Sequence, residues 1–482
     1  MKSGVSRAIV LSFALVLGSC GGGGSSSSNN NGGAAGAPVL TKPRFTSAGS
    51  ASVAENTADA FYTATATDPQ NDPVSITLYS GRDADKFVLE DGGRLRFNTA
   101  PNYDLPIDAD RNNVYEVTLR ATAAGESTDL NLSVAVTNDR EGIVVTRVVS
   151  GLSRIVAANF IHNEEELLIA DEMGRVLRVN PITGDVTEDT YIRDRRYEGE
   201  ILAVSYGFPG QPYQEGVYIV THSPVLGLYA QSFNEARGKY DQFRLGDPWS
   251  APVTASIASQ GELYIAIGDP SGNLAQDSSS PYGKLYRVNY YNPYAGATLP
   301  RGDTMVLRPR LYGDGIQNPG GFSAASAYLI FADRGSAGFH ELTYFNRDWQ
   351  PLDFGWPFYE GVQAQRTSPP AVVNGANIVY RIGDDRAQGA GVVAGLLNDT
   401  NFFEELGRSY VFGDVDGSIF TVNRSRFSDG FSHSAEVIED RTEDFVPDVG
   451  TIDELVAIVM GRGSDHFFLV DADGEIFRVE GQ

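Results

Sequence analysis

Short alternations of apolar and polar residues recur along most of the chain after its first forty positions. In the stretches from Tyr115 to Ala121 and from Leu130 to Val136, apolar side chains stand at every second position. A period of two is typical of strands that bury one face. Asp, Asn, Gly or Pro residues bound these runs, as tight turns require. The pattern therefore predicts an all-β protein.

The runs fall into two parts. Residues 43–141 hold about seven of them in roughly a hundred positions, the size and rhythm of a Greek-key β-sandwich. Residues 143–482 instead repeat one unit, in which an apolar strand, an Asp or Gly turn and a second strand follow one another. The unit begins six times, near these positions: Leu167, Val217, Leu263, Tyr328, Tyr410 and Phe467.

Six such hairpins predict a six-bladed β-propeller, because each blade buries its faces only against its neighbours. The apolar run Ile143 to Val149 is expected to complete the last blade and close the ring. The predicted fold is thus an N-terminal β-sandwich followed by a six-bladed β-propeller.

The N-terminus has the features of an export signal. Lys2 and Arg7 precede the apolar run Ala8 to Leu17, which is too short for a permanent membrane span. Residues 1–19 are therefore interpreted as a signal peptide, and Leu17 to Cys20 as a lipobox. Cys20 is the only cysteine and has no disulfide partner, which favours lipidation over a plain secretory signal that happens to end in cysteine.

Residues 20–42 are rich in Gly, Ser and Asn and have almost nothing to bury, so they are expected to form a flexible tether. Gly21, rather than Asp, follows the lipid site and favours the outer membrane. The predicted location is the cell envelope, as an outer-membrane lipoprotein on either the periplasmic face or the cell surface.

The charge balance is acidic, with 62 Asp and Glu against 37 Lys and Arg. An excess of this sign argues against nucleic acid as a partner. It suits calcium, and it equally suits an exported protein that needs only to stay soluble.

The first part resembles a cadherin-like repeat at these landmarks: Ser52 to Asn56, Ala64 to Asp68, Ala100 to Asp104, Asn113 to Val117 and Val136 to Asp139. The resemblance implies calcium held by oxygen ligands at the end facing the next domain, with Glu55, Asp104, Asn138 and Asp139 as candidates. Asn102 stands where an acidic residue is usual, and Asp104 is shorter than the usual Glu. The alternative is that these side chains cap turns.

The second part resembles the quinone-dependent glucose/sorbosone dehydrogenases at these segments: Tyr264 to Asp269, Asn273 to Asp277, Gly283 to Asn289, Gly315 to Phe322, Phe331 to Gly335 and Phe354 to Gly361. The resemblance implies pyrroloquinoline quinone (PQQ) and calcium at the central face of the propeller. The positions implied for the cofactor are Asp269, Gln276, Asp277, Gln317 and Asn318, and those implied for the metal are Asp333 and Glu341. Holding loops by side-chain bonds to the backbone is the alternative role for Asp269 and Asn318.

Three departures put catalysis in doubt. The histidine that takes the hydroxyl proton in that family falls near Ser250, and its cofactor arginine is Gln317, which lacks the charge and the bidentate fork. The first of two expected glutamates is also replaced, by His340. The five histidines, His162, His222, His340, His433 and His466, show no metal-ligand spacing and are expected in loops or at the rim.

Two functions follow as hypotheses. The first is a membrane-anchored, calcium-binding surface or adhesion protein whose propeller is non-catalytic and binds a carbohydrate or a protein. The second is an active PQQ- and calcium-dependent dehydrogenase of a sugar or polyol.

Overall fold

The computed structural model describes residues 41–482 apart from these positions: 162–165, 195–198, 208–215, 236–237, 251, 260–262, 270, 292–305, 326–327, 337, 349–351, 367–376, 382–389, 399–402, 429–430 and 462–464. The predicted signal peptide (1–19), the lipid site Cys20, most of the tether and His162 lie outside the described residues. Within them, no helix is long and apolar enough to cross a membrane.

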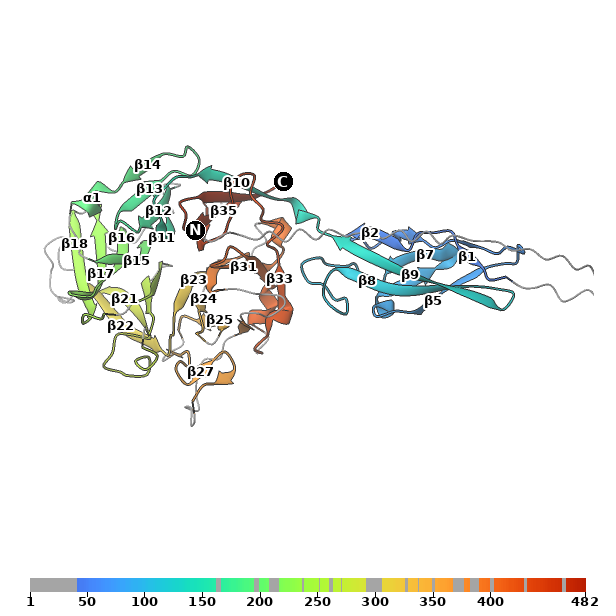
Figure 1. The fold of residues 1–482 in the computed structure, drawn as a ribbon. Helices are drawn as coiled ribbons and strands as arrows, with labels where there is room; N and C mark the ends of the chain where they lie inside the picture. The colour runs from blue at the N-terminus through green and yellow to red at the C-terminus, as the bar shows by residue number, and fades with distance from the viewer. Residues whose placement is uncertain are drawn as a thin grey trace, which may run out of the picture.

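The N-terminal part is a β-sandwich, which projects from one side of the second part (Figure 1). One sheet has the order β2 (Ser50–Ala54), β9 (Glu126–Thr137), β8 (Val114–Ala123) and β5 (Ser75–Ser80). The other has the order β3 (Tyr62–Thr63), β7 (Arg94–Phe97) and β6 (Phe87–Glu90), and β1 (Arg44–Phe45) pairs with β4 (Ala66–Thr67). Strands β2 and β9 are parallel.

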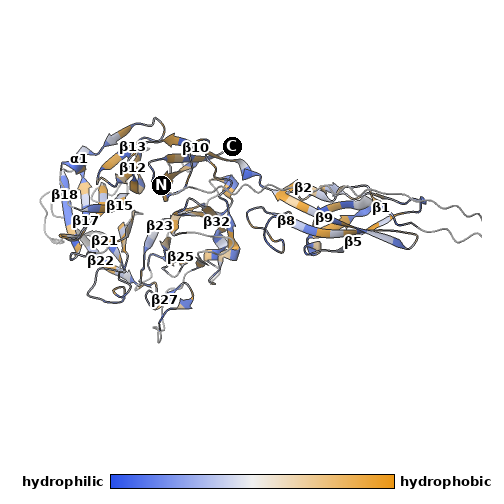
Figure 2. Cartoon of the chain, viewed as in Figure 1, coloured by the Kyte–Doolittle hydropathy of each residue, from blue (hydrophilic) through white to orange (hydrophobic). Residues whose placement is uncertain are grey.

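The alternation of buried and exposed residues along the strands explains why the two sheets of the sandwich pack face to face. Burial along β8 changes at every residue, and hydrophobic and hydrophilic positions alternate along β8 and β9 in Figure 2. The buried face carries an aromatic cluster, in which the ring centroids of Phe87 and Phe97 lie 4.6 Å apart and those of Phe97 and Tyr115 lie 4.9 Å apart. This cluster forms the centre of the sandwich core.

The second part is a ring of six sheets (Figure 1). The first three have these orders: β11 (Ile155–Ile161), β12 (Glu166–Asp171), β13 (Val176–Val179) and β14 (Val186–Glu188); β15 (Glu200–Tyr206), β16 (Val217–Ser223), β17 (Gly227–Asn234) and β18 (Lys239–Gly246); and β19 (Ala255–Ser259), β20 (Leu263–Ile267), β21 (Lys284–Tyr291), β22 (Val306–Asp314) and β26 (Leu352–Asp353). A short helix, α1 (Thr190–Arg193), follows β14.

The remaining three sheets are β23 (Pro319–Ala325), β24 (Tyr328–Asp333), β25 (Phe339–Asn346) and β29 (Ile378–Arg381); β30 (Val392–Leu397), β31 (Ser409–Asp414), β32 (Ile419–Asn423) and β33 (Ile438–Asp440); and β34 (Leu455–Met460), β35 (His466–Asp471), β36 (Ile476–Gly481) and β10 (Ile143–Val149). Strands β27 (Tyr359–Glu360) and β28 (Gln363–Ala364) form a small hairpin beside them. The predicted six-bladed propeller is confirmed.

The ring closes through its first strand. Strand β10 pairs antiparallel with β36 from Ile143 opposite Gly481 to Val149 opposite Ile476, so the sixth blade joins both ends of the propeller. The prediction that Ile143 to Val149 completes the last blade is confirmed.

Strands in the middle of the blades are buried along their whole length rather than at alternate positions. All seven residues of β16, all five of β20 and all six of β31 are buried. Each blade packs between two neighbours, so both faces of its middle strands lose contact with water. Continuous apolar runs therefore mark blades, whereas alternation marks the sandwich.

Candidate functional site

A buried aspartate ends the second strand of four blades, at Asp171, Asp333, Asp414 and Asp471, and in the third blade Asp269 lies two residues after the end of β20. Each is buried and accepts hydrogen bonds from backbone N–H groups of the adjacent turn or of the loop that enters its blade. A carboxylate with several backbone donors fixes the chain around it. These aspartates therefore define how the loops of each blade are held.

Asp269 has the most complete set of such bonds. Its Oδ1 accepts from the N–H groups of Ser271 (3.1 Å) and Gly272 (3.0 Å), and its Oδ2 accepts from those of Leu274 (2.8 Å) and Ala275 (2.9 Å). Both oxygens thus point into the polypeptide loop that Asp269 itself begins. The loop-holding alternative for this residue agrees with these contacts.

Asp333 holds the residues that the resemblance assigns to the cofactor. Its oxygens accept from the backbone N–H groups of Gln317 (2.9 Å) and Asn318 (2.6 Å), and the backbone N–H of Asp269 donates to the carbonyl of Gln317 (2.8 Å). Asp269, Gln317, Asn318 and Asp333 therefore lie together between the third and fourth blades. Burial raises the pKa of Asp333 to about 6, although the backbone donors oppose the rise.

Two glutamates extend this group. Glu341 on β25 stands directly opposite Asp333 on β24 and accepts from the backbone N–H of Gly361. Glu360 on β27 is buried, and its carboxylate accepts from the N–H of Phe339 (3.4 Å). Burial, with smaller repulsion from Asp333 and Glu360, raises the pKa of Glu341 to about 8. Burial therefore favours the protonated form of Glu341 at neutral pH.

Sequence reasoning missed Glu360 and Lys284. Glu360 falls in the segment Phe354 to Gly361, and Lys284 in the segment Gly283 to Asn289, so the motifs could have directed attention to both. The Lys284 ammonium is buried and donates to the carbonyls of Leu274 and Ala275. It therefore stabilises the loop from within.

Gln276 and Asp277, the other predicted cofactor residues, are engaged in the same loop. The Gln276 amide donates to Asp353 and to the carbonyl of Trp356, both at 3.0 Å. Asp277 is exposed and accepts from the N–H and hydroxyl of Ser279. The hydrogen bonds join Gln276 to the Trp356 loop and leave Asp277 in its own turn, and neither residue is bonded to Asp333.

PQQ carries three carboxylates and needs cationic or donor groups around it. Among the described residues, Asp333, Glu341 and Glu360 form an acidic central group that offers only carboxyl groups to a ligand. The nearby Arg334 is cationic, but its Nε donates to the carbonyl of Val392 (2.8 Å). These residues do not fit a tricarboxylate. Carboxyl oxygens are the ligands that calcium prefers, so Glu341 and Glu360 fit such an ion in kind.

The histidine prediction is wrong for two residues. His222 lies on β16 and His340 on β25, and both are almost completely buried within blades rather than in loops or at the rim. His340 accepts a hydrogen bond from Gly335 (3.3 Å), and His222 lies 3.4 Å from Glu200. Apolar blade interiors tolerate these rings because each has a polar partner.

The four calcium candidates of the sandwich gather at its end. Glu55 is buried, and its two oxygens accept from the N–H groups of Tyr103 (2.8 Å) and Asp139 (3.0 Å). Asn138 accepts from the N–H of Arg140. Asp104 is buried, whereas Asp139 is exposed. The structure thus places these residues near one another, at the junction with the propeller.

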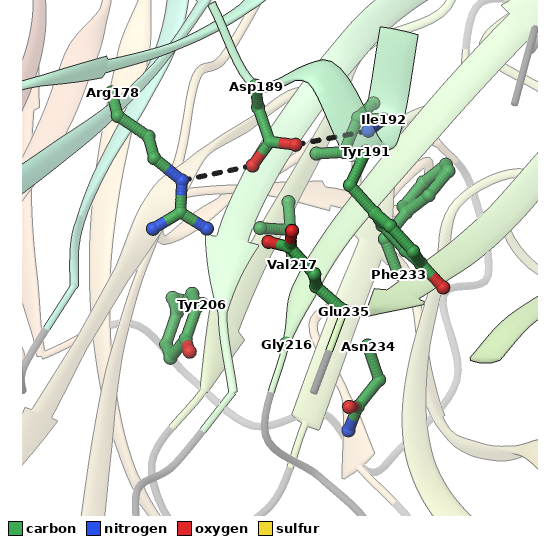
Figure 3. Close-up of a pocket in the computed structure, with 10 residues that line it drawn as sticks. All are labelled: Arg178, Asp189, Tyr191, Ile192, Tyr206, Gly216, Val217, Phe233, Asn234 and Glu235. Atoms are coloured by element: carbon green, nitrogen blue, oxygen red, sulfur yellow. Dashed lines mark hydrogen bonds and ion pairs between the residues drawn. The ribbon is translucent and has the colours of Figure 1, made fainter. Parts of the chain in front are cut away.

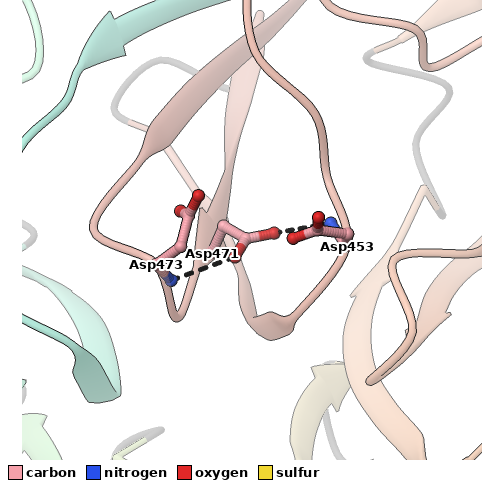
Figure 4. A group of neighbouring side chains, drawn as sticks. All are labelled: Asp453, Asp471 and Asp473. Atoms are coloured by element: carbon pink, nitrogen blue, oxygen red, sulfur yellow. Dashed lines mark hydrogen bonds between the residues drawn. The ribbon is translucent and has the colours of Figure 1, made fainter. Parts of the chain in front are cut away.

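A carboxylate cluster occurs at the sixth blade. Among the described residues, Asp453, Asp471 and Asp473 bring three candidate ligand atoms within 4.8 Å of one another (Figure 4). Asp471 already accepts from the N–H groups of Asp453 (2.9 Å), Glu454 (3.0 Å) and Asp473 (3.2 Å). This is the turn-holding arrangement of the other blades, and it explains the cluster without an ion.

A separate cavity of about 290 Å³ lies between the first two blades. Figure 3 shows Tyr191, Tyr206 and Arg178 around it, with the Arg178 guanidinium joined to Asp189. Arg178 lies 3.0 Å from Asp189 and 3.6 Å from Glu166, so two carboxylates balance its charge. The cavity involves other blades than the acidic central group.

Comparison with known proteins bears on the fold. No family model and no curated protein matches the chain. The soluble aldose sugar dehydrogenase of Escherichia coli, in its apo form, matches with a TM-score of 0.50 and 14% identity, over 70% of this chain and 100% of that chain. A glucose dehydrogenase matches with a TM-score of 0.50 and 18% identity, over 70% and 99%. At such identities the likeness shows the propeller fold alone.

Proposed function

We propose that this chain is a membrane-anchored binding protein of the cell envelope, whose dehydrogenase-like propeller binds a carbohydrate or a protein without turnover. One observation carries the proposal. The side chains of Asp269, Asp333 and Gln276, at positions where the resemblance implies cofactor or metal ligands, are used to hold the protein's own backbone. A propeller can keep its converging loops for binding after its chemistry is lost.

The catalytic positions support the same proposal. Ser250 is exposed in the segment between β18 and β19, and it has no ionisable group that could take a proton at neutral pH. Gln317 is buried and carries no charge to pair with a cofactor carboxylate. Removal of a general base commonly lowers a rate at least about a hundredfold.

The proposed anchor is a lipid on Cys20, followed by the tether of residues 20–42. This arrangement would hold the sandwich and the propeller at the outer membrane, on either its periplasmic or its outer face. The partner is then a molecule of the envelope or its surroundings, a carbohydrate or a surface protein.

Calcium is proposed at the propeller rather than at the four sandwich positions. Glu341 and Glu360 are the residues that would hold it, and the ion would replace the proton that burial favours on Glu341. Its role would be to fix the hairpin of β27 and β28 against β25.

The alternative is an active PQQ- and calcium-dependent sugar or polyol dehydrogenase. The observation that favours it is Glu341, since a carboxyl group with a pKa of about 8 is matched to proton transfer near neutral pH. In that case Glu341 would not hold calcium, and its ionised form would take the proton that a histidine takes in the family.

The two functions are separated by one experiment on the purified chain with Cys20→Ser, which removes the lipid site. The protein is mixed with PQQ and calcium, and dye reduction is followed over a panel of sugars and polyols. We expect no quinone binding and no sugar-dependent reduction, together with retention on a glycan array or by an envelope extract. Bound quinone with sugar-dependent reduction that Glu341→Gln abolishes would establish the enzyme instead.

A further inference from the structure

A buried guanidinium lies where the end of the sandwich meets the propeller. Arg441 follows β33, and only 6% of its side chain is exposed. Its Nε lies 3.1 Å from an Asp104 oxygen, its Nη2 lies 2.7 Å from Glu141, and it also pairs with Asp444 of its own blade. A residue of the propeller is therefore inserted among acidic residues of the sandwich and its exit.

Acidic groups far outnumber basic ones around this contact. Glu55 and Asp104 approach from the sandwich, Glu141 from the connection, and Asp444 from the fifth blade. Asp104 and Asp444 are each at least 95% buried, and both oxygens of Asp104 and one oxygen of Asp444 have no hydrogen-bond partner. A buried set of this kind is stabilised by a cation in its midst or by protonation of its carboxyl groups. Burial raises the pKa of Asp104 to about 8, and the positive charge of Arg441 opposes that rise.

Three of the four positions to which the resemblance assigns calcium are already engaged by groups of the protein itself. Asp104 is paired with Arg441, both Glu55 oxygens accept backbone N–H groups, and Asn138 accepts from Arg140. Calcium requires six to eight oxygen ligands at about 2.3–2.6 Å, and a fixed positive charge beside Asp104 repels it.

The connection between the two parts is also tightly determined. Arg140, Glu141 and Gly142 all have positive φ angles, of 53°, 46° and 79°. Non-glycine residues keep such angles only where surrounding contacts impose them. Arg140 supplies such contacts, because its guanidinium donates to the carbonyls of Asp444 (2.8 Å) and Val446 (2.7 Å).

Further bonds cross the same junction. The N–H of Asp440 donates to the carbonyl of Asp104 (3.1 Å), the Asn102 amide donates to Glu439 (3.3 Å), and the Tyr103 hydroxyl donates to Glu443 (3.0 Å). These contacts orient the sandwich relative to the fifth blade around Arg441.

We propose that Arg441 is the resident cation of the acidic end of the sandwich, so that the junction between sandwich and propeller closes without calcium. The inference goes beyond binding of a partner. It assigns a guanidinium-binding site to Asp104, Glu141 and Asp444, and it implies that removing the guanidinium leaves a vacant acidic site for a divalent cation.

The test measures the junction directly. Spin labels are attached at Thr77→Cys on the sandwich and Glu172→Cys on the propeller, both exposed positions, in the full chain with Cys20→Ser. Double electron–electron resonance then gives the distribution of distances between the labels in EDTA and in calcium chloride. This readout does not respond to calcium bound elsewhere in the propeller unless the junction moves.

For the unmodified junction we expect a narrow distribution in EDTA that calcium leaves unchanged. For Arg441→Gln we expect a broad distribution in EDTA that narrows when calcium is added. Arg96→Gln, which removes a 2.8 Å ion pair with Glu90 inside the sandwich, is the matched control and should behave as the parent. Arg441→Lys keeps the charge and should lie between parent and Arg441→Gln.

Two results would overturn the proposal. The first is a distance distribution of the parent that is broad in EDTA and becomes narrow with calcium, because the ion would then be the resident cation. The second is a distance distribution of the Arg441→Gln variant in EDTA that is as narrow as that of the parent. The parent measurement and the Arg441→Lys variant keep the proposal testable if Arg441→Gln does not fold.

Discussion

Replacing Asp269 by alanine should destabilise the propeller strongly, although the residue is at a position implied to bind cofactor. The change leaves four backbone N–H groups without their acceptor, of which that of Ala275 is fully buried. Hydrogen bonds to a charged group are worth about 1.5–3 kcal/mol each, and they do not add fully. We expect a loss of about 3–5 kcal/mol in the free energy of unfolding. This is less than the sum of the four bonds, because the exposed amides recover hydrogen bonds to water.

The assay is urea and thermal unfolding followed by tryptophan fluorescence. A loss of this size should lower the Tm by roughly 5–10 °C in a domain of this length. Asp471→Ala, which removes three equivalent bonds from the sixth blade, should cause a comparable loss. Asp277→Ala is the control in the same loop, since its carboxylate is exposed and should leave the Tm unchanged. An Asp269→Ala protein with the parent's Tm but impaired ligand binding would refute the loop-holding role.

Three further changes probe other parts of the propeller. Tyr410→Phe leaves the buried N–H of Gly395 without the hydroxyl that accepts its hydrogen bond at 3.0 Å. Unfolding in urea should therefore show a free energy of unfolding that is lower by about 1–3 kcal/mol, and an unchanged value would mean that water replaces the hydroxyl. Val145→Asp puts a charge at a buried position of β10 and should lower the free energy of unfolding by more than about 4 kcal/mol. Limited proteolysis should then cut the propeller faster than in the parent, whereas Thr146→Asp on the same strand should leave the rate of cleavage unchanged. Burial raises the pKa of Glu341 to about 8 from 4.5, so the stability that its proton adds is complete below the lower value and is lost as the pH rises through the higher one. Glu341→Gln should therefore flatten the fall in Tm between pH 5 and about 8.5, and parallel curves for variant and parent would contradict this assignment.

The sequence predicted the strands because burial imposes a period that side chains must follow. Six hairpins begin near Leu167, Val217, Leu263, Tyr328, Tyr410 and Phe467, and each corresponds to the second strand of a blade. The closing strand β10 was predictable for the same reason, since an unpaired apolar run at one end of a ring needs a partner at the other.

The site was harder to predict because its residues break the usual rules for charge. Lys284 and Glu360 are buried, and sequence alone assigns charged side chains to the surface. Comparison of the blades could have suggested the role of Asp269, because Asp414 and Asp471 end the second strands of their own blades and Asp269 follows the second strand of its blade by two residues. A residue repeated at one place in many blades serves the fold that all blades share.

Contacts between distant segments were out of reach for pattern reasoning. Asp104 and Arg441 are separated by more than three hundred positions, and Arg441 lies in a polar stretch without periodicity. Nothing local in either segment specifies the other. Only the relative placement of the sandwich and the fifth blade brings the two charges together.

Strand β10 has a mechanical consequence for a chain held at its N-terminus. It is the first strand after the sandwich and also the partner of β36, the last strand of the ring. With the proposed lipid anchor and the proposed partner on the propeller, tension between the two would pass from the contacts of Arg140 and Arg441 into the β10–β36 ladder. The force would therefore load the closure of the ring itself, and rupture there would open the propeller before it unfolded any single blade.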